Sequence, residues 1–236
     1  MTPAADAALA GRASAPLVGL LVVGKAPRPA LLAEIARVTG EAELRMLGAL
    51  DHLSDDEVRA RPPRDDADTL FTTLPDGSTT LVSKAVVTEG MAARLADLSA
   101  MGASAAVVCC TGRFAGLAAP GVHFASDLLA GAVTACLPRG GRLGVFIPSP
   151  AQAANAVARW AASGLEAVAL PLSPDADADA IEAAARAMQG EAPDLVAMDC
   201  ISYTQAARAR AAAIHGAPAL LAASVAGRFA AELAGV

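Results

Sequence analysis

The chain is short of three things that mark common classes of binding protein: positive charge, aromatic side chains and long apolar runs. Its 236 residues carry 18 Lys and Arg against 24 Asp and Glu, a formal net charge of −6, and only 3% are aromatic. Nucleic-acid-binding domains normally show a basic balance or a basic stripe, and single-strand binders stack bases on aromatic rings. We therefore expect no nucleic-acid partner.

No apolar run approaches the roughly 20 residues that a membrane-spanning helix needs. The longest early run covers residues 16–23, and Arg12 is the only basic residue before it. A signal peptide begins with a more basic head, so we interpret this run as a buried strand. We expect no membrane partner.

Cysteine is scarce as well, and its spacing does not match a disulfide framework. The four cysteines are Cys109, Cys110, Cys136 and Cys200. A chain of this length can bury a core large enough to fold without covalent cross-links. We therefore expect reduced thiols and a cytoplasmic location.

The features that are present indicate an α/β protein. Hydrophobic residues make up 55% of the chain, which excludes a disordered chain. Short apolar runs lie at residues 17–23, 105–110, 142–147, 166–170, 195–200 and 219–223. Helical stretches alternate with them, and the runs are continuous rather than alternating, which is typical of parallel strands buried on both faces.

One segment interrupts this rhythm. Residues 69–74 and 78–83 are β-prone and flank Pro75, Asp76 and Gly77. Asp-Gly between two such runs is a strong signal for a β-hairpin. The hairpin is either a decoration of the surface or the edge of a lid over a site.

The strand pattern is approximately repeated along the chain. Residues 17–28 and 143–150 are both strand-then-turn units, and each precedes a later strand that ends in a cysteine. The repeat predicts two α/β lobes of similar plan. We assign residues 1–114 and 216–236 to an N-terminal lobe, with the hairpin of residues 69–83 inserted in it, and residues 115–215 to a C-terminal lobe.

Cys110 and Cys200 are the two strand-end cysteines. Ligands of parallel sheets bind outside the carboxyl ends of the strands, so both thiols are expected to face one cleft between the lobes. A helix that follows such a strand would favour the thiolate through its dipole and free amides. A free cysteine is also commonly an inert buried residue, as we expect for Cys109, on the opposite sheet face, and for Cys136, in an Ala-rich helix.

Several segments together resemble the AroM family. They are residues 24–29 (Gly-Lys-Ala-Pro-Arg-Pro), residues 48–54 (Gly-Ala-Leu-Asp-His-Leu-Ser), Cys110-Thr111-Gly112, Met198-Asp199-Cys200 and residues 224–233. The AroM family in turn is similar to the cofactor-independent aspartate/glutamate racemase superfamily. The resemblance implies two pseudo-symmetric Rossmann-like lobes, an active-site cleft between them, and a cysteine from each lobe.

The chemistry implied by this resemblance is proton transfer next to a carboxylate. A thiolate and a thiol on opposite faces of a substrate can exchange the roles of base and acid without a cofactor. Arg28 is the candidate for pairing the substrate carboxylate, although a surface ion pair explains it equally well. Groups expected to stabilise the anionic intermediate are the amides of Thr111 and Gly112 and the hydroxyls of Ser149 and Ser202.

The histidines and Lys84 do not predict a metal site or a further catalytic site. The three histidines, His52, His123 and His215, lack the spacing of zinc ligands. Lys84, at the end of the hairpin, is expected to be an ordinary surface lysine. We expect neither a metal nor a cofactor.

The sequence leaves several functions open. The leading hypothesis is a racemase or isomerase of a small carboxylate that uses Cys110 and Cys200 as an acid/base pair. The alternatives are a single-thiol decarboxylase or cis–trans isomerase of a diacid, and a non-catalytic small-molecule-binding or regulatory protein. The last follows from the altered motifs at both cysteines. Thr111-Gly112 stand where the superfamily has Asn-Thr, and Asp199-Cys200-Ile201-Ser202 replace its second motif without an adjacent His. The expected partner is a small carboxylate, and the resemblance leaves a homodimer as an option.

Overall fold

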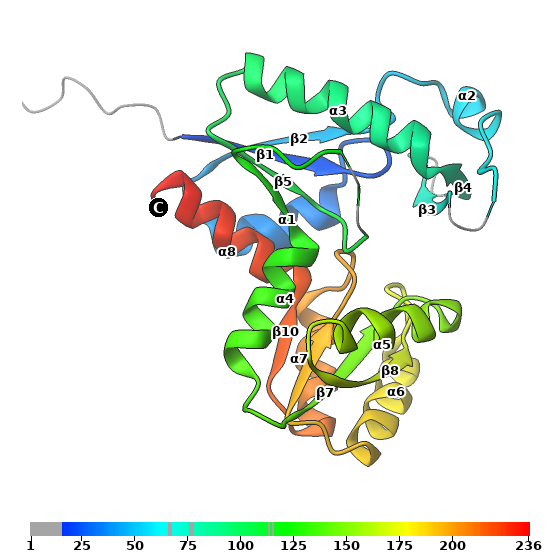
Figure 1. Cartoon of the computed structure of the whole chain (residues 1–236), viewed down its shortest axis with the longest axis vertical. Helices are drawn as coiled ribbons and strands as arrows, with labels where there is room; N and C mark the ends of the chain where they lie inside the picture. Colours follow the sequence, from blue (N-terminus) through cyan, green and yellow to red (C-terminus); the bar gives the residue numbers. More distant parts are fainter. Residues whose placement is uncertain (1–15, 66–67, 76–77, 113, 115) are drawn as a thin grey trace, which may run out of the picture.

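Two four-stranded parallel sheets form the centres of two lobes in the computed structural model, which describes residues 16–236 apart from 66–67, 76–77, 113 and 115 (Figure 1). The first sheet has the order β2-β1-β5-β6 and comprises β1 (Leu17–Val22), β2 (Glu43–Gly48), β5 (Ala105–Val108) and β6 (Val122–Phe124). The second has the order β10-β9-β7-β8 and comprises β7 (Arg142–Ile147), β8 (Glu166–Pro171), β9 (Leu195–Met198) and β10 (Ala219–Leu221). The predicted α/β class is confirmed.

Helices connect the strands and cover the sheets. They are α1 (Pro29–Thr39), α2 (Asp55–Arg59), α3 (Lys84–Ala100), α4 (Ala125–Cys136), α5 (Ala153–Ala161), α6 (Ala178–Gly190), α7 (Gln205–His215) and α8 (Ala222–Ala234), with a short 3₁₀ turn, η1 (Pro150–Gln152), before α5. The central strands β1 and β7 are buried along almost their whole length. Burial on both faces explains why these strands are apolar at every position.

The two sheets repeat one topology strand for strand. β1 pairs with β2 and β5, and β7 pairs in the same parallel manner with β8 and β9. β6 adds to β5, as β10 adds to β9. The chain thus reverses its order of strands between β1 and β5 and again between β7 and β9, and ligands of open parallel sheets bind at such switch points.

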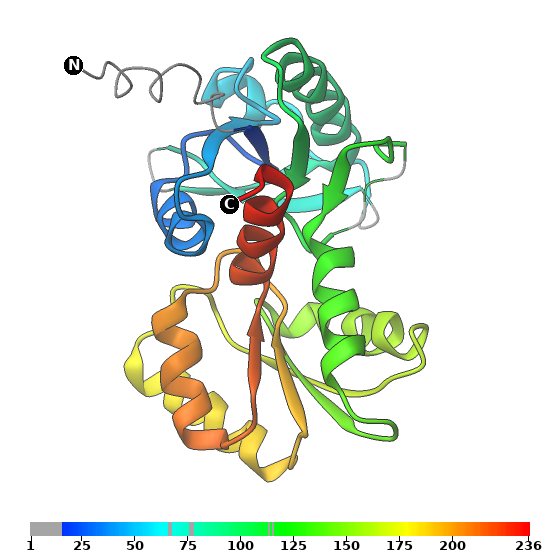
Figure 2. The same cartoon turned by 90° about the vertical axis from the view of Figure 1, so that its left-hand side faces the viewer.

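The chain crosses between the lobes through α4 and α8, which lie side by side (Figures 1 and 2). α8 also packs on α1, and a Cβ atom at Gly227 would come within 2.5 Å of Val38 Cγ2. Ser224 lies in the first turn of α8, which begins at Ala222. The lobe boundaries at residues 114/115 and 215/216 stay a prediction, while sheet membership points to crossings after β6 and after β10.

The predicted hairpin is confirmed. Strands β3 (Thr69–Thr73) and β4 (Thr79–Ser83) pair antiparallel, and their Asp76-Gly77 turn lies outside the described residues. Val82 of β4 is buried in the same apolar cluster as Val108, the last residue of β5. The hairpin therefore contributes to the apolar cluster that contains the end of a central strand.

Candidate active site

The two predicted cysteines occupy equivalent places in the two lobes. β5 ends at Val108 and β9 at Met198, so Cys110 and Cys200 each follow their strand by two residues rather than ending it. The charge of Cys200 is one of the causes that raise the pKa of Cys110. The strand ends also touch directly, because Thr111 Oγ1 donates a hydrogen bond to the carbonyl of Asp199 at 3.2 Å.

Cys110 is a half-buried thiol with three neighbours that favour its anion. Burial and, to a smaller extent, the neighbouring Cys200 raise its pKa, which is about 11 when all the neighbours act together. The amide of Gly112 donates to the sulfur at 3.3 Å and lowers the pKa, as do the charges of Lys84 and Arg159. Because burial is the largest of these effects, the thiol is neutral at pH 7.

Cys200 is in a similar position but has different neighbours. Burial raises its pKa, while hydrogen bonds from the amide and the hydroxyl of Ser202 and the charge of Arg28 lower it. Backbone amides favour the two thiolates, as expected, but the amides of Gly112 and Ser202 that do so do not belong to a helix. α7 begins only at Gln205, five residues beyond Cys200, and burial outweighs the donors near the sulfur.

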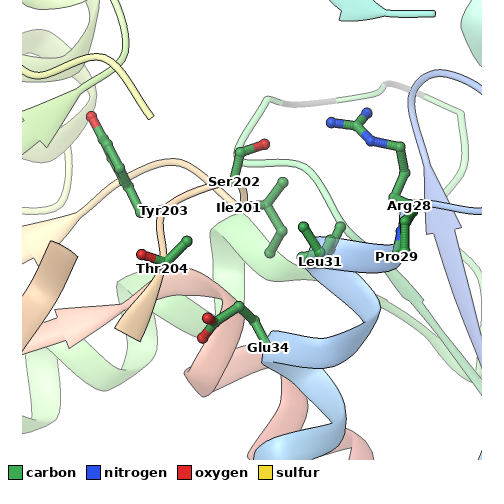
Figure 3. Close-up of a pocket in the computed structure, with 9 residues that line it drawn as sticks. Arg28, Pro29, Leu31, Glu34, Ile201, Ser202, Tyr203 and Thr204 are labelled. Atoms are coloured by element: carbon green, nitrogen blue, oxygen red, sulfur yellow. The ribbon is translucent and has the colours of Figure 1, made fainter. Parts of the chain in front are cut away.

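Arg28 reaches the side of the site that contains Cys200. It stands just before α1, with Pro29 as the first helical residue, a position that suits the fixed backbone of proline. A pocket of about 140 Å³ lies between this end of α1 and the loop after β9. The guanidinium of Arg28 and the hydroxyl of Ser202 extend toward each other across it (Figure 3).

The turn that carries Arg28 is held by a residue that the sequence did not single out. Asp51 accepts hydrogen bonds from the amides of Ala26 at 2.8 Å and Gly48 at 2.7 Å, and so joins the turns after β1 and β2. A Cβ atom at Gly48 would lie 2.4 Å from the Asp51 carboxylate and 2.5 Å from the carbonyl of Gly24. The segment of residues 48–54 therefore has a structural role in positioning Arg28.

Arg159 of α5 is a second residue that sequence reasoning missed. Its guanidinium donates to the carbonyl of Thr111 at 3.0 Å and forms an ion pair with Asp199. The Asp199 side chain is only 2% exposed. Arg159 thus connects the residue after Cys110 with the residue before Cys200. The available signal was Asp199 itself, a carboxylate at the end of an apolar strand that requires a cationic partner when buried.

Lys84, expected to be an ordinary surface lysine, is half-buried, and its charge acts on Cys110. Ser83 caps α3 by accepting from the amide of Val86 at 3.3 Å, which makes Lys84 the first helical residue. The ammonium lies 5.8 Å from the ring centre of Phe114, and its charge acts on Cys110. The approach of the hairpin to β5 is a long-range contact that the sequence pattern does not reveal.

The remaining predicted binding groups have local partners. The Gly112 amide donates to Cys110, which differs from the predicted role as an oxyanion donor. The Ser149 hydroxyl accepts from the amide of Ala151 at 3.4 Å and caps η1. The substrate-binding roles of Thr111, Gly112, Ser149 and Ser202 stay predictions.

The other cysteines lie apart from this arrangement. Cys109 is buried in a different apolar cluster from the one that Cys110 borders, as expected for adjacent residues of an extended chain. Burial raises the pKa of its thiol to about 12. Cys136 is exposed at the end of α4.

The described residues contain neither a metal-binding cluster nor a membrane-spanning helix. In that part of the chain, no group of three or more His, Cys, Asp or Glu side chains is arranged to hold a metal ion. Nor does any described helix combine the length and the apolar character needed to cross a membrane.

The family model named AroM protein matches residues 18–234, nearly the whole described chain. The chain belongs to the AroM family. No curated protein matches this AroM-family chain in sequence.

Solved structures share its fold at low sequence identity. An arylmalonate decarboxylase superposes with a TM-score of 0.64 at 16% identity, covering 93% of this chain and 92% of that one. Glutamate racemase isoform RacE1 from Bacillus anthracis gives 0.57 at 14% identity, with 91% and 80% covered. The maleate isomerase Iso from Pseudomonas putida S16 gives 0.56 at 13% identity, with 90% of each chain covered. These likenesses show the racemase-like fold of two lobes.

Proposed function

We propose that this AroM-family protein racemises or isomerises a small carboxylate by proton transfer between Cys110, Cys200 and the carbon next to the carboxylate. The observation that carries the proposal is the pair of thiols just after equivalent strands of the two lobes, with the charge of Cys200 acting on the ionisation of Cys110. One glutamate racemase and one maleate isomerase share the fold.

The reaction needs one thiolate and one thiol. The thiolate takes the proton from the carbon, so that a C–H bond breaks, an S–H bond forms and the electron pair moves into the carboxylate as an enediolate. The second thiol then gives its proton to the other face of that carbon and is left as the thiolate. Arg28 and Ser202, which face each other across the pocket beside Cys200, are proposed to bind the carboxylate.

A second candidate is favoured by one observation, the raised pKa of both thiols. A neutral thiol is a proton donor, which is what a single-thiol decarboxylase requires. In that reaction the C–C bond to one carboxylate breaks, carbon dioxide leaves, and a thiol protonates the enediolate before water restores its proton. An arylmalonate decarboxylase shares this fold.

The proposal includes a cellular location and a redox state for the thiols. The four cysteines are free, which supports a cytoplasmic protein with reduced thiols. The proposed partner is a small carboxylate substrate.

The test is incubation in D₂O with a pool of amino, hydroxy and dicarboxylic acids. Loss of α-proton signals is followed by NMR, and carbon dioxide release is followed in parallel. Cys110→Ser and Cys200→Ser are each expected to lower proton exchange by about 100-fold or more, because a hydroxyl is a far weaker acid than a thiol. Cys136→Ser, at an exposed position, is the control and keeps full activity.

The outcomes separate the candidates. Exchange that requires both cysteines supports the racemase or isomerase. Carbon dioxide release from a diacid that survives one of the two substitutions supports the single-thiol decarboxylase. If folded protein gives neither signal, both enzyme proposals fail and a binding or regulatory protein is left.

A further inference from the structure

A second pocket, of about 170 Å³, lies where α1, α7 and α8 meet. Its described lining consists of Glu34, Arg37, Val38, Gln205, Arg208, Ser224 and Arg228. α1 comes from the first lobe and α7 from the second. Among the described residues, Glu34 alone also lines the pocket beside Arg28.

This pocket has an excess of positive charge. Three arginines and one carboxylate line it, which leaves a formal charge of +2 (3 − 1). The carboxylate of Glu34 already accepts a hydrogen bond from the amide of Gln205, the first residue of α7, at 3.1 Å. Glu34 therefore offsets only part of the positive charge.

Two of the arginines repel each other. Burial lowers the pKa of Arg208, and the positive charge of Arg228 lowers it further, while Glu34 acts in the opposite direction. Arg208 is half-buried, so solvent screens this repulsion less than at an open surface. A dianion between the guanidiniums would remove the repulsion and gain charge-assisted hydrogen bonds.

We propose that the pocket between α1, α7 and α8 binds the phosphate group of a small molecule through Arg37, Arg208 and Arg228. A phosphate group carries about −1.5 to −2 charges at neutral pH, which matches the excess. A single carboxylate would neutralise half of it. Guanidinium forks fit phosphate oxygens bidentately, and Ser224 stands in the first turn of α8, where the helix dipole favours an anion.

An occupant of this pocket contacts both lobes, because α1 follows a strand of the first sheet and α7 follows a strand of the second. It also lies next to Glu34, which lines the pocket beside Arg28 as well. Phosphate binding is therefore expected to stabilise the present arrangement of the lobes. This inference does not depend on the proposed reaction.

The experiment is isothermal titration calorimetry with inorganic phosphate and with phenyl phosphate, and with acetate as the monovalent comparison, all at matched ionic strength. We expect saturable phosphate binding with a dissociation constant below about 1 mM. Phenyl phosphate binding more tightly than inorganic phosphate identifies an ester as the ligand, and the reverse identifies the free ion. Acetate is expected to bind at least about tenfold more weakly.

The variants are Arg208→Gln and Arg228→Gln, with Arg210→Gln as the matched control. Arg210 is on the same helix as Arg208 but pairs with Glu182 at 3.1 Å, outside the pocket. Each test substitution is expected to weaken phosphate binding about tenfold or more, and the control to leave it unchanged. Thermal unfolding without ligand verifies that the variants are folded.

Three results would overturn the proposal: no phosphate binding, equal affinity for acetate, or an affinity that neither test variant changes. The double variant Cys110→Ser, Cys200→Ser is expected to bind phosphate like the original protein. If this variant loses catalysis and still binds phosphate, the phosphate site has been tested independently of the proposed reaction.

Discussion

Single residues decide the charge of the two thiols on which the proposed chemistry depends. For Cys110, burial opposes a backbone amide and two cations and outweighs them, so that the pKa is raised to about 11. Cys200 has another set of donors, from Ser202 and Arg28, and its pKa is raised as well. The site therefore holds its protons at neutral pH and is better prepared to donate one than to accept one.

The raised pKa predicts how the reactivity of the Cys110 thiol depends on pH. Below pH 11 the thiolate fraction rises about tenfold for each pH unit, because the thiolate is the deprotonated form. Alkylation of Cys110 by iodoacetamide, followed by peptide mass spectrometry, is expected to be slow at pH 7 and to accelerate up to about pH 11. Exposed Cys136 provides the reference rate. Fast alkylation of Cys110 at pH 7 would contradict the structure.

The raised pKa of Cys110 also distinguishes the two candidate reactions. A racemase that begins with a thiolate gains kcat/KM as the pH rises toward the pKa of Cys110. A decarboxylase that begins with a neutral thiol has a flat profile and loses activity only above that pKa. A pH profile of the active substrate distinguishes them.

At the level of the elements, close contacts between backbones hold the strand ends in place. α3, whose first residue is Lys84, rests on the turn after β2 at Gly90. A Cβ atom at Gly90 would lie 2.0 Å from the carbonyl oxygen of Ala49. That oxygen belongs to the backbone, so it cannot move aside like the end of a flexible side chain.

Gly90→Ala is therefore expected to destabilise the fold by about 1–3 kcal/mol, because the helix must shift to relieve the overlap. Chemical denaturation measures the free energy of unfolding. Gly131→Ala in α4 is the matched control, since a Cβ atom there meets nothing within 4 Å. The control is expected to gain up to about 1 kcal/mol from helix propensity. Equal effects at the two sites would refute the close contact.

Elements with a strong local signal were predictable, and those fixed by distant contacts were not. The strands β1 and β7 were predictable from their continuous apolar runs, and the hairpin β3-β4 from its two β-prone runs. β6 has three half-buried residues, too few to form a pattern. The cysteines stand out because each follows a buried strand, whereas Lys84 and Arg159 sit in helices and reach the site only through tertiary packing.

At the level of the whole molecule, one arginine connects the ends of both sheets. Arg159 binds the carbonyl of Thr111 in the first lobe and the buried carboxylate of Asp199 in the second. A buried ion pair contributes little net stability, but removal of one partner leaves an unpaired buried charge. The arrangement of the lobes thus depends on this contact more than the strength of the pair suggests.

Arg159→Met is expected to lower the free energy of unfolding by about 3–5 kcal/mol, because Asp199 is left without its cation. The double variant Arg159→Met, Asp199→Leu is expected to recover much of that loss. The control is Arg186→Met on α6, whose pair with Glu182 is exposed, with an effect within about 1 kcal/mol. Denaturant titrations of all the variants measure these differences. Without recovery in the double variant, the ion pair is not the cause.

The duplicated topology also constrains the kinetics. The two thiols are equivalent by position but not by surroundings, since Lys84 and Arg159 act on Cys110 and Arg28 acts on Cys200. Two mirror-image forms of a chiral substrate have equal free energy in solution, so the overall efficiency of a racemase must be equal in both directions. The difference between the two lobes can then appear only in the separate values of kcat and KM. Both are larger for one enantiomer, and by the same factor.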